Sequence, residues 1–143
     1  DLNNFHKLAQ MSPSLHSMSS ICCEPMEIAV PKRHLHIIKS ALTHGDKPFM
    51  GIVTEKERAE DVMKMAGIVF GDNYVKDNTV VVSITNCNSP LVWDQTMLDA
   101  MRVYASHNQP VICAPFALCG ASTSASAIGA VAQVSAASTG VVV

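Results

Sequence analysis

The sequence has few charged residues, few aromatic residues and no long apolar run, and these absences exclude several classes of protein. Charged residues make up 15% of the 143 residues and aromatic residues 5%. The net charge is -2 and Lys and Arg do not cluster, which argues against a nucleic-acid partner. The longest apolar stretch, residues 111–121, is interrupted by Pro115 and falls short of the roughly 18 residues of a membrane span. We therefore expect neither nucleic acid nor a membrane as a partner.

Motifs for phosphate and metal binding are also missing. No GxGxxG follows the first predicted strand, and no GxxxxGK[ST] occurs anywhere. The six histidines do not group into a zinc-binding spacing such as HExxH. The five cysteines are an odd number without CxxC spacing, which argues against a zinc ribbon and a disulfide framework. We therefore predict no metal site, and a cytoplasmic protein whose reduced cysteines serve as small apolar residues.

What the sequence does contain is alternation between strand-like and helix-like segments. Apolar residues make up 48% of the chain, so one domain over residues 1–143 can bury a substantial core. Thr54 and Glu57 fit a capping box, and Asp94 is placed to cap a later helix, with Trp93 as its hydrophobic staple. The predicted helices cover residues 2–11, 31–43, 55–70, 95–107 and 124–137. The predicted strands cover residues 20–24, 47–53, 79–85 and 111–114, of which 79–85 reads as covered on both faces.

The strands begin about 30 residues apart, which is the length of one βαβ unit, so they are predicted to be parallel. Four such units can be half of a (β/α)8 barrel, which takes about 250 residues, or a small doubly wound sheet. The chain begins at Asp1 rather than Met and stops in STGVVV, so both ends look cut. The expected fold is therefore α/β: a partial (β/α)8 TIM barrel with about four βα units of parallel sheet and flanking helices.

In either parallel fold the carboxyl ends of the strands hold the site, and four candidate binding residues follow strands there. Glu24 can hold a cation or act as an acid or base, or it is simply paired on the surface. Asn86 and Asn88 carry amides that both donate and accept, although one of them can instead make an Asx turn. Phe116 can form a wall for a methylated ammonium group, or pack in the core.

Five segments in order resemble the trimethylamine methyltransferase family of corrinoid-dependent methyltransferases. They are NFHKLAQMSP, DKPFMG, ERAEDVMKMA, NSPLVWDQTML and QPVICAPFALCGA, and the resemblance runs from residue 4 to about residue 133. It implies an internal fragment of a longer (β/α) barrel. Residues 134–143 depart from the family pattern, so we place no functional weight on them.

The resemblance also implies an activity: transfer of a methyl group from trimethylamine, or from a quaternary amine such as glycine betaine, to the Co(I) of a corrinoid. The corrinoid (cobalamin) is supplied by a cognate corrinoid protein, so no cofactor is expected to bind this chain directly. One branch of the family uses pyrrolysine, whose position is expected beyond this fragment, so no residue of this chain is assigned a catalytic role. The full-length protein is expected to be a cytoplasmic homo-oligomer of methylamine metabolism and methanogenesis.

Two other functions compete with this hypothesis. One is a small stand-alone α/β binding or interaction domain without catalysis. The other is a Schiff-base lyase on the same barrel, which is disfavoured because no lysine follows directly on the carboxyl end of a predicted strand.

Overall fold

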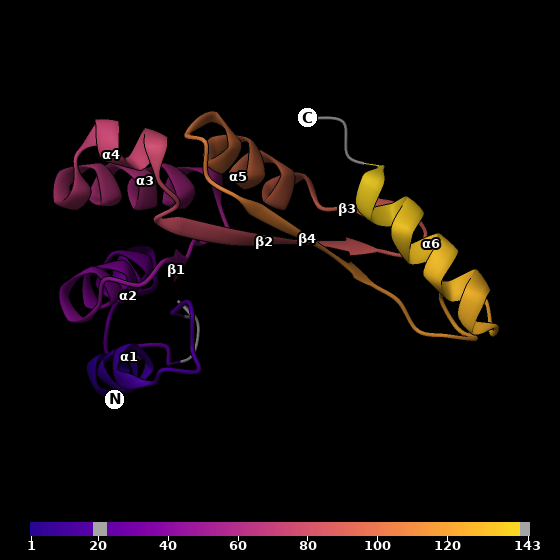
Figure 1. Ribbon diagram of the computed structural model, residues 1–143, viewed down its shortest axis with the longest axis horizontal. Coiled ribbons are helices and arrows are strands. Elements are labelled where there is room, and N and C mark those ends of the chain that lie inside the picture. The colour runs from indigo at the N-terminus through magenta and orange to yellow at the C-terminus, as the bar shows by residue number, and fades with distance from the viewer. Residues whose placement is uncertain (19–22, 141–143) are drawn as a thin grey trace.

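The computed structural model describes residues 1–18 and 23–140, and in this part of the chain helices alternate with strands (Figure 1). The helices are α1 (Leu2–Met11), α2 (Val30–His44), α3 (Lys56–Phe70), α4 (Asp72–Asp77), α5 (Gln95–Ser106) and α6 (Ala127–Thr139). The strands are β1 (Phe49–Met50), β2 (Val81–Asn88), β3 (Val92–Trp93) and β4 (Val111–Phe116).

The main strands form a parallel sheet whose order follows the sequence. β1 pairs with β2 and β2 pairs with β4, in both cases parallel. Met18 forms a further parallel bridge with Phe49, so the order is Met18, β1, β2 and β4. Short β3 turns back and pairs antiparallel with the end of β2. The predicted α/β class and the parallel sheet with flanking helices are confirmed, while most of the predicted strand 20–24 lies outside the described residues.

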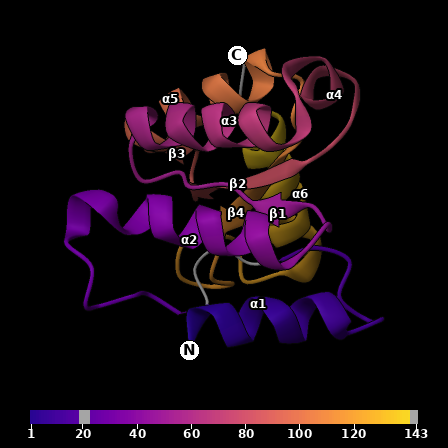
Figure 2. The same ribbon diagram turned by 90° about the vertical axis from the view of Figure 1, so that its left-hand side faces the viewer.

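The helices pack on one another in sequence order. α1 contacts α2, α2 contacts α3, and α3 contacts α5; Figure 2 shows α1, α2 and α3 stacked in this order. Their inward faces and the beginnings of the strands share one apolar core. Its most deeply buried large side chains include Met18, Ile38, Phe49, Val62 and Tyr104. No helix within residues 1–18 and 23–140 is long and apolar enough to cross a membrane.

Burial along β2 alternates, so only one face of this strand is fully covered. Val81, Ser83, Thr85 and Cys87 are buried, whereas Asn86 and Asn88, at the end of the other face, are exposed. Within the predicted segment 79–85 the other face is half-buried at Val82 and Ile84, so the predicted coverage of both faces holds only in part, and the exposed residues follow the segment. A central strand that is open at its carboxyl end leaves room for polar side chains that a fully buried strand could not hold.

Gln109 fixes the start of β2 through a buried amide. Its Oε1 accepts hydrogen bonds from the backbone N–H of Val80 at 2.9 Å and of Val81 at 3.0 Å. Its Nε2 donates to the carbonyl oxygens of Val75 at 2.6 Å and Asn78 at 3.1 Å. One side chain thus satisfies backbone groups where α4 ends and β2 begins, and those of Val75, Val80 and Val81 are buried away from water.

The helix termini only partly follow the predicted capping. Asp94 caps α5 as predicted, because its Oδ1 accepts from the Met97 N–H at 3.0 Å. The predicted capping box at Thr54 is wrong: α3 begins one residue later, with Glu55 as a cap residue that makes no side-chain capping bond. Arg58 donates to both Glu55 carboxylate oxygens and to Thr54 Oγ1, so these side chains bind Arg58 and make no capping bond to the start of the helix.

Candidate functional site

Asn86 and Asn88 lie on the open face of β2, beside residues of β4. The strand continues to Asn88 instead of ending at Thr85, so the two asparagines belong to the strand and not to a turn. In the parallel ladder, Asn86 pairs with Ala114 and Asn88 pairs with Phe116. Side chains at paired positions and at every second residue point to the same face of a sheet. The two amides and the Phe116 ring therefore share one surface at the carboxyl ends of β2 and β4.

These side chains line a hollow of about 380 Å³, which we call the strand-end depression. It is lined by Asn86, Asn88, Ala114, Pro115 and Phe116. None of these residues is ionisable. Phe116 is 60% exposed, which is unusual for a phenylalanine that only packs in a core. Within the described chain neither asparagine amide has a hydrogen-bond partner, so their donors and acceptors are available to a ligand.

The structure places Glu24 in a different hollow, of about 280 Å³, next to Asp1, Cys23 and His36. Its carboxylate forms an exposed ion pair with Arg33 at 3.2 Å, and Arg33 Nε also donates to the carbonyl oxygen of Ile28. The structure thus brings together Asn86, Asn88 and Phe116, and places Glu24 elsewhere. An acid already paired at the surface offers no charge to the strand-end depression, whose lining is neutral.

The turn after β2 is made by Ser89 and the residues that follow it. The Ser89–Pro90 peptide bond is cis, and Leu91 has a left-handed φ of 53°. Ser89 also connects the ends of the two strands: its N–H donates to the Phe116 carbonyl oxygen at 3.2 Å, and its Oγ donates to the Ser122 carbonyl oxygen at 3.0 Å. The depression is therefore fixed at its outer end by main-chain and side-chain hydrogen bonds.

The loop that follows β4 is held by its own backbone. The Leu118 carbonyl oxygen accepts from the N–H groups of Ala121, Ser122 and Thr123, and Gly120 adopts a left-handed φ of 81° that suits glycine. Ser126 then caps α6, accepting from the Gly129 N–H at 3.2 Å. The main chain that leaves Phe116 is thus ordered by local hydrogen bonds, which keeps this wall of the depression in place.

The opposite face of β2, together with the adjoining β3, contains buried polar atoms. Ser83 Oγ, Thr85 Oγ1 and Trp93 Nε1 are buried without a hydrogen-bond partner among the described residues. Burial, followed by the neighbouring Cys113, raises the pKa of the Cys87 thiol. A thiol with a raised pKa stays protonated at neutral pH, so Cys87 is not an activated nucleophile.

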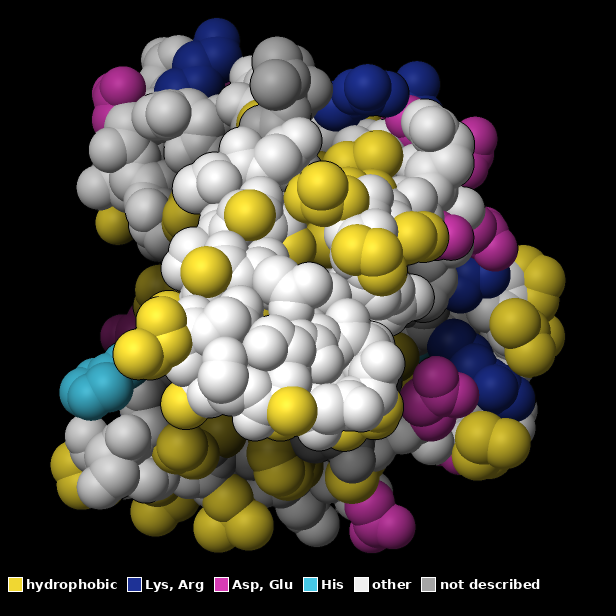
Figure 3. Space-filling model, turned by 90° about the vertical axis from the view of Figure 1, so that its right-hand side faces the viewer, with side chains coloured by type: hydrophobic (Ala, Val, Ile, Leu, Met, Phe, Trp, Pro, Cys, Tyr) yellow, Lys and Arg dark blue, Asp and Glu magenta, His cyan; other side chains and the backbone are white. Residues whose placement is uncertain are grey.

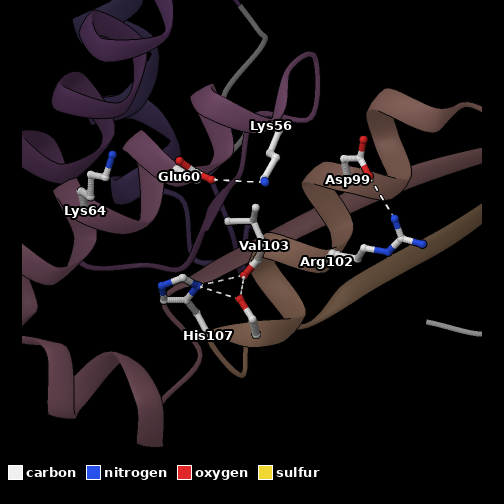
Figure 4. A pocket seen from close by; sticks show the side chains of 8 residues that line it. Lys56, Glu60, Lys64, Asp99, Arg102, Val103 and His107 are labelled. Carbon is white, nitrogen blue, oxygen red and sulfur yellow. Dashed lines mark hydrogen bonds and ion pairs between the residues drawn. The ribbon is translucent and has the colours of Figure 1, made fainter.

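A larger hollow, about 580 Å³, lies elsewhere, between α3 and α5 (Figure 4). Its charged side chains are paired along each helix: Lys56 with Glu60 at 3.8 Å, and Arg102 with Asp99 at 3.0 Å. His107 Nδ1 is hydrogen-bonded to the Val103 carbonyl oxygen at 2.8 Å. This groove lies on the outer surface of two helices, away from the strand ends, and its charges already have partners.

Comparison with known proteins identifies the family. The family described as Trimethylamine methyltransferase (MTTB) matches residues 1–142. The chain belongs to this family. A glycine betaine methyltransferase from Desulfitobacterium hafniense (strain Y51) is 39% identical over 130 residues, which are 90% of this chain. The chain spans 27% of the length of that relative. The resemblance read from five short segments is thereby confirmed.

The lining of the strand-end depression was predicted from the sequence only in part. Ala114 and Pro115 were missed as lining residues, because their place depends on the register between β2 and β4. The alternation of residue types at the end of the strand, with Cys87 between Asn86 and Asn88, is the signal that could have shown that β2 continues to Asn88. No group of three or more His, Cys, Asp or Glu side chains in the described part of the chain is arranged to hold a metal ion.

Proposed function

We propose that the chain is part of a longer methyltransferase that transfers a methyl group from a quaternary amine of the glycine betaine kind to the Co(I) of a corrinoid. The family and the named activity of the 39% identical relative support this proposal. The observation that carries it in the structure is the strand-end depression, where an exposed aromatic ring and two unpaired amides meet at the carboxyl ends of parallel strands.

The proposal includes a partial (β/α)8 barrel. The strand order Met18, β1, β2 and β4 follows the sequence, as in a barrel, whereas a doubly wound sheet reverses its order at a switch point. The helices α2, α3 and α5 contact one another in the same order. In this arrangement the open face of β2 and β4 points to the interior of the barrel. Among the described residues β4 pairs only with β2, so its other edge is available to a next strand.

The lining suits a methylated ammonium group. The negative face of the Phe116 ring attracts a cation, and an ammonium that carries methyl groups loses little hydration when it leaves water. Because nothing in the lining is charged, an amine is held without a competing ion pair. In the reaction the C–N bond breaks, its electron pair stays on the amine, and Co(I) supplies the pair for the new Co–C bond. This chain contributes by positioning the amine for in-line attack, and we assign no catalytic residue to it.

The corrinoid reaches the site on a separate corrinoid protein, which docks at the strand ends. The side of the molecule that carries α6 is largely uncharged near its centre, with hydrophobic side chains around it and charged ones near its periphery (Figure 3). Leu118, after β4, and Ile128 and Val131, on α6, are exposed hydrophobic residues. Exposed apolar residues at this end are consistent with coverage by another protein surface. We further propose that the full-length enzyme is a cytoplasmic homo-oligomer.

The test uses the full-length protein that contains this chain, with glycine betaine as methyl donor and free Co(I) cobalamin as acceptor. The cobalamin absorption spectrum reports the methylation, and dimethylglycine is quantified as the second product. We expect equal amounts of methylated cobalamin and dimethylglycine. Trimethylamine is the comparison donor. Absence of transfer from every methylated amine, with folded protein and with the corrinoid protein present, would refute the proposed function.

A further inference from the structure

The strand-end depression has an inner level and an outer level, set by the strand register. Asn88 and Phe116 form the outer pair, at the last residues of β2 and β4. Asn86 and Ala114 form the inner pair, two residues earlier and so about 6.6 Å deeper along the strands. Two residues earlier again, Ile84 is paired with Ile112, so the same face of the sheet continues beyond the hollow with apolar side chains. The aromatic ring and the inner amide therefore lie at different distances from the strand ends within one hollow.

The two levels differ in what they can bind. At the outer level the exposed Phe116 ring offers a face to a cation. At the inner level the small Ala114 side chain leaves space beside the Asn86 amide, which has no partner within residues 1–18 and 23–140. An amide N–H donates well to a carboxylate, and a hydrogen bond to a charged group is stronger than one between neutral groups.

The lining is neutral as a whole, which favours a ligand without net charge. A free carboxylic acid would bring an unbalanced anion, and a simple tetraalkylammonium an unbalanced cation. A betaine carries both charges one methylene apart, so each charge can meet its own partner without leaving a net charge in the hollow. The acceptor of the methyl group arrives from outside, so the ammonium must lie at the outer level.

We propose that Asn86 is the specificity-determining residue that binds the carboxylate of a betaine at the inner level, while Phe116 and Asn88 hold its trimethylammonium group at the outer level. The inference rests on the proposed function and adds the orientation of the ligand to it. This orientation of the betaine also explains why the hollow that binds a carboxylate is lined by two neutral amides and not by an arginine or a lysine. A cation there would repel the ammonium only one methylene away.

The experiment measures binding by calorimetry to the full-length protein, with glycine betaine and tetramethylammonium as probes. Asn86→Asp keeps the shape of the side chain but places a carboxylate against that of the ligand. We expect Asn86→Asp to weaken the binding of glycine betaine at least about tenfold, whereas tetramethylammonium should bind as well as or better than before. Asn86→Ser removes the amide without adding charge, so it should weaken the binding of glycine betaine but not that of tetramethylammonium.

Asn88→Asp should strengthen the binding of tetramethylammonium. It should weaken the binding of glycine betaine less than Asn86→Asp does.

Asn73→Asp is the matched control, because Asn73 is an exposed asparagine on α4, away from the strand ends, and its replacement should change neither affinity. If the Asn86 variants lost affinity equally for both probes, or if Asn88→Asp lost more affinity for glycine betaine than Asn86→Asp, the assignment of Asn86 would be overturned. The proposed methyl transfer from betaine would not be affected by either result. A wild-type protein that binds neither probe and transfers no methyl group would overturn both the assignment and the proposed function.

Discussion

Asn88 on β2 lies directly beside Phe116 on β4, and both side chains point to the open face of the sheet. A polar amide and an exposed aromatic ring at neighbouring positions do not stabilise a core, but together they can hold a methylated cation. This pair is the centre of the proposed site.

Replacing Asn88 by Ala should lower methyl transfer without unfolding the protein. The Asn88 amide is exposed and has no hydrogen-bond partner among the described residues, so its loss leaves no buried group unsatisfied. We expect kcat/KM with glycine betaine to fall about tenfold or more, as expected for the loss of one substrate contact. The thermal midpoint should move little, and Asn73→Ala serves as the control. Unchanged turnover in Asn88→Ala would reject its role in the site.

Gln109→Leu should destabilise the fold far more than its small change in volume implies. The replacement leaves the N–H groups of Val80 and Val81 and the carbonyl oxygen of Val75 buried without their partner. We expect a loss of about 3 kcal/mol in the free energy of unfolding, measured by urea denaturation of the full-length protein. Gln95→Leu, at an exposed position of α5, should cost less than about 0.5 kcal/mol. Equal effects of the two substitutions would contradict the assigned role of Gln109.

The contact between α2 and α3 should depend on acid pH through Asp61. The hydrogen bond from His34 lowers the pKa of Asp61 below its ordinary value of 3.8, with a further contribution from Lys64. A carboxyl whose pKa is lower in the folded state stabilises the fold above its unfolded pKa, and this contribution is lost as the pH falls through the folded pKa. Asp61→Asn should therefore be less stable than the wild type near neutral pH, and the difference should vanish well below pH 3.8.

The expected size of this difference is below about 1 kcal/mol, because the Asp61 carboxylate is 38% exposed and water screens the pair. Urea denaturation at a series of pH values measures it. Asp77→Asn, at an exposed position of α4, is the control and should show no such pH dependence. A stability gap between Asp61→Asn and the wild type that widens toward low pH would contradict the predicted direction of the effect.

The 143-residue chain on its own should associate or aggregate. β4 leaves one edge unpaired within the described residues, and Ile112 and Phe116 on its face are exposed. An exposed strand edge with apolar neighbours is a template for pairing with another chain. Size-exclusion chromatography with a thermal melt should show dimers or larger species and a broad transition. A monomer that melts cooperatively would instead favour the stand-alone α/β binding domain.

Five of the six helices in the described part of the chain could be predicted from the sequence, because their signals are local, whereas α4 was not predicted and α6 begins three residues later than predicted. The apolar spacing predicted α1 at its observed bounds, and the bounds of α2, α3 and α5 came within about two residues. The cap at Asp94 was predicted for the same reason. At Thr54 the prediction failed: the hydroxyl accepts from Arg58, and α3 begins after Glu55, which the Ser/Thr-x-x-Glu pattern does not reveal.

The site could be predicted only in part, because it depends on how distant segments pair. The residue types of Asn86, Asn88 and Phe116 and their place at strand ends were informative, and the β2–β4 register does bring them together. Glu24 lies in another hollow and is paired with Arg33, which no strand rule predicts. From the sequence, Gln109 was interpreted only as part of a helix stop. Its structural role was not visible, because its five side-chain hydrogen bonds join segments about 30 residues apart as well as its own turn.

The most direct test is a crystal structure of the full-length protein with glycine betaine bound. We expect the ligand between the ends of β2 and β4, with its trimethylammonium group against Phe116 and its carboxylate toward Asn86. Glycine betaine bound instead beside Glu24, in the groove between α3 and α5, or elsewhere in the protein would contradict the proposed site.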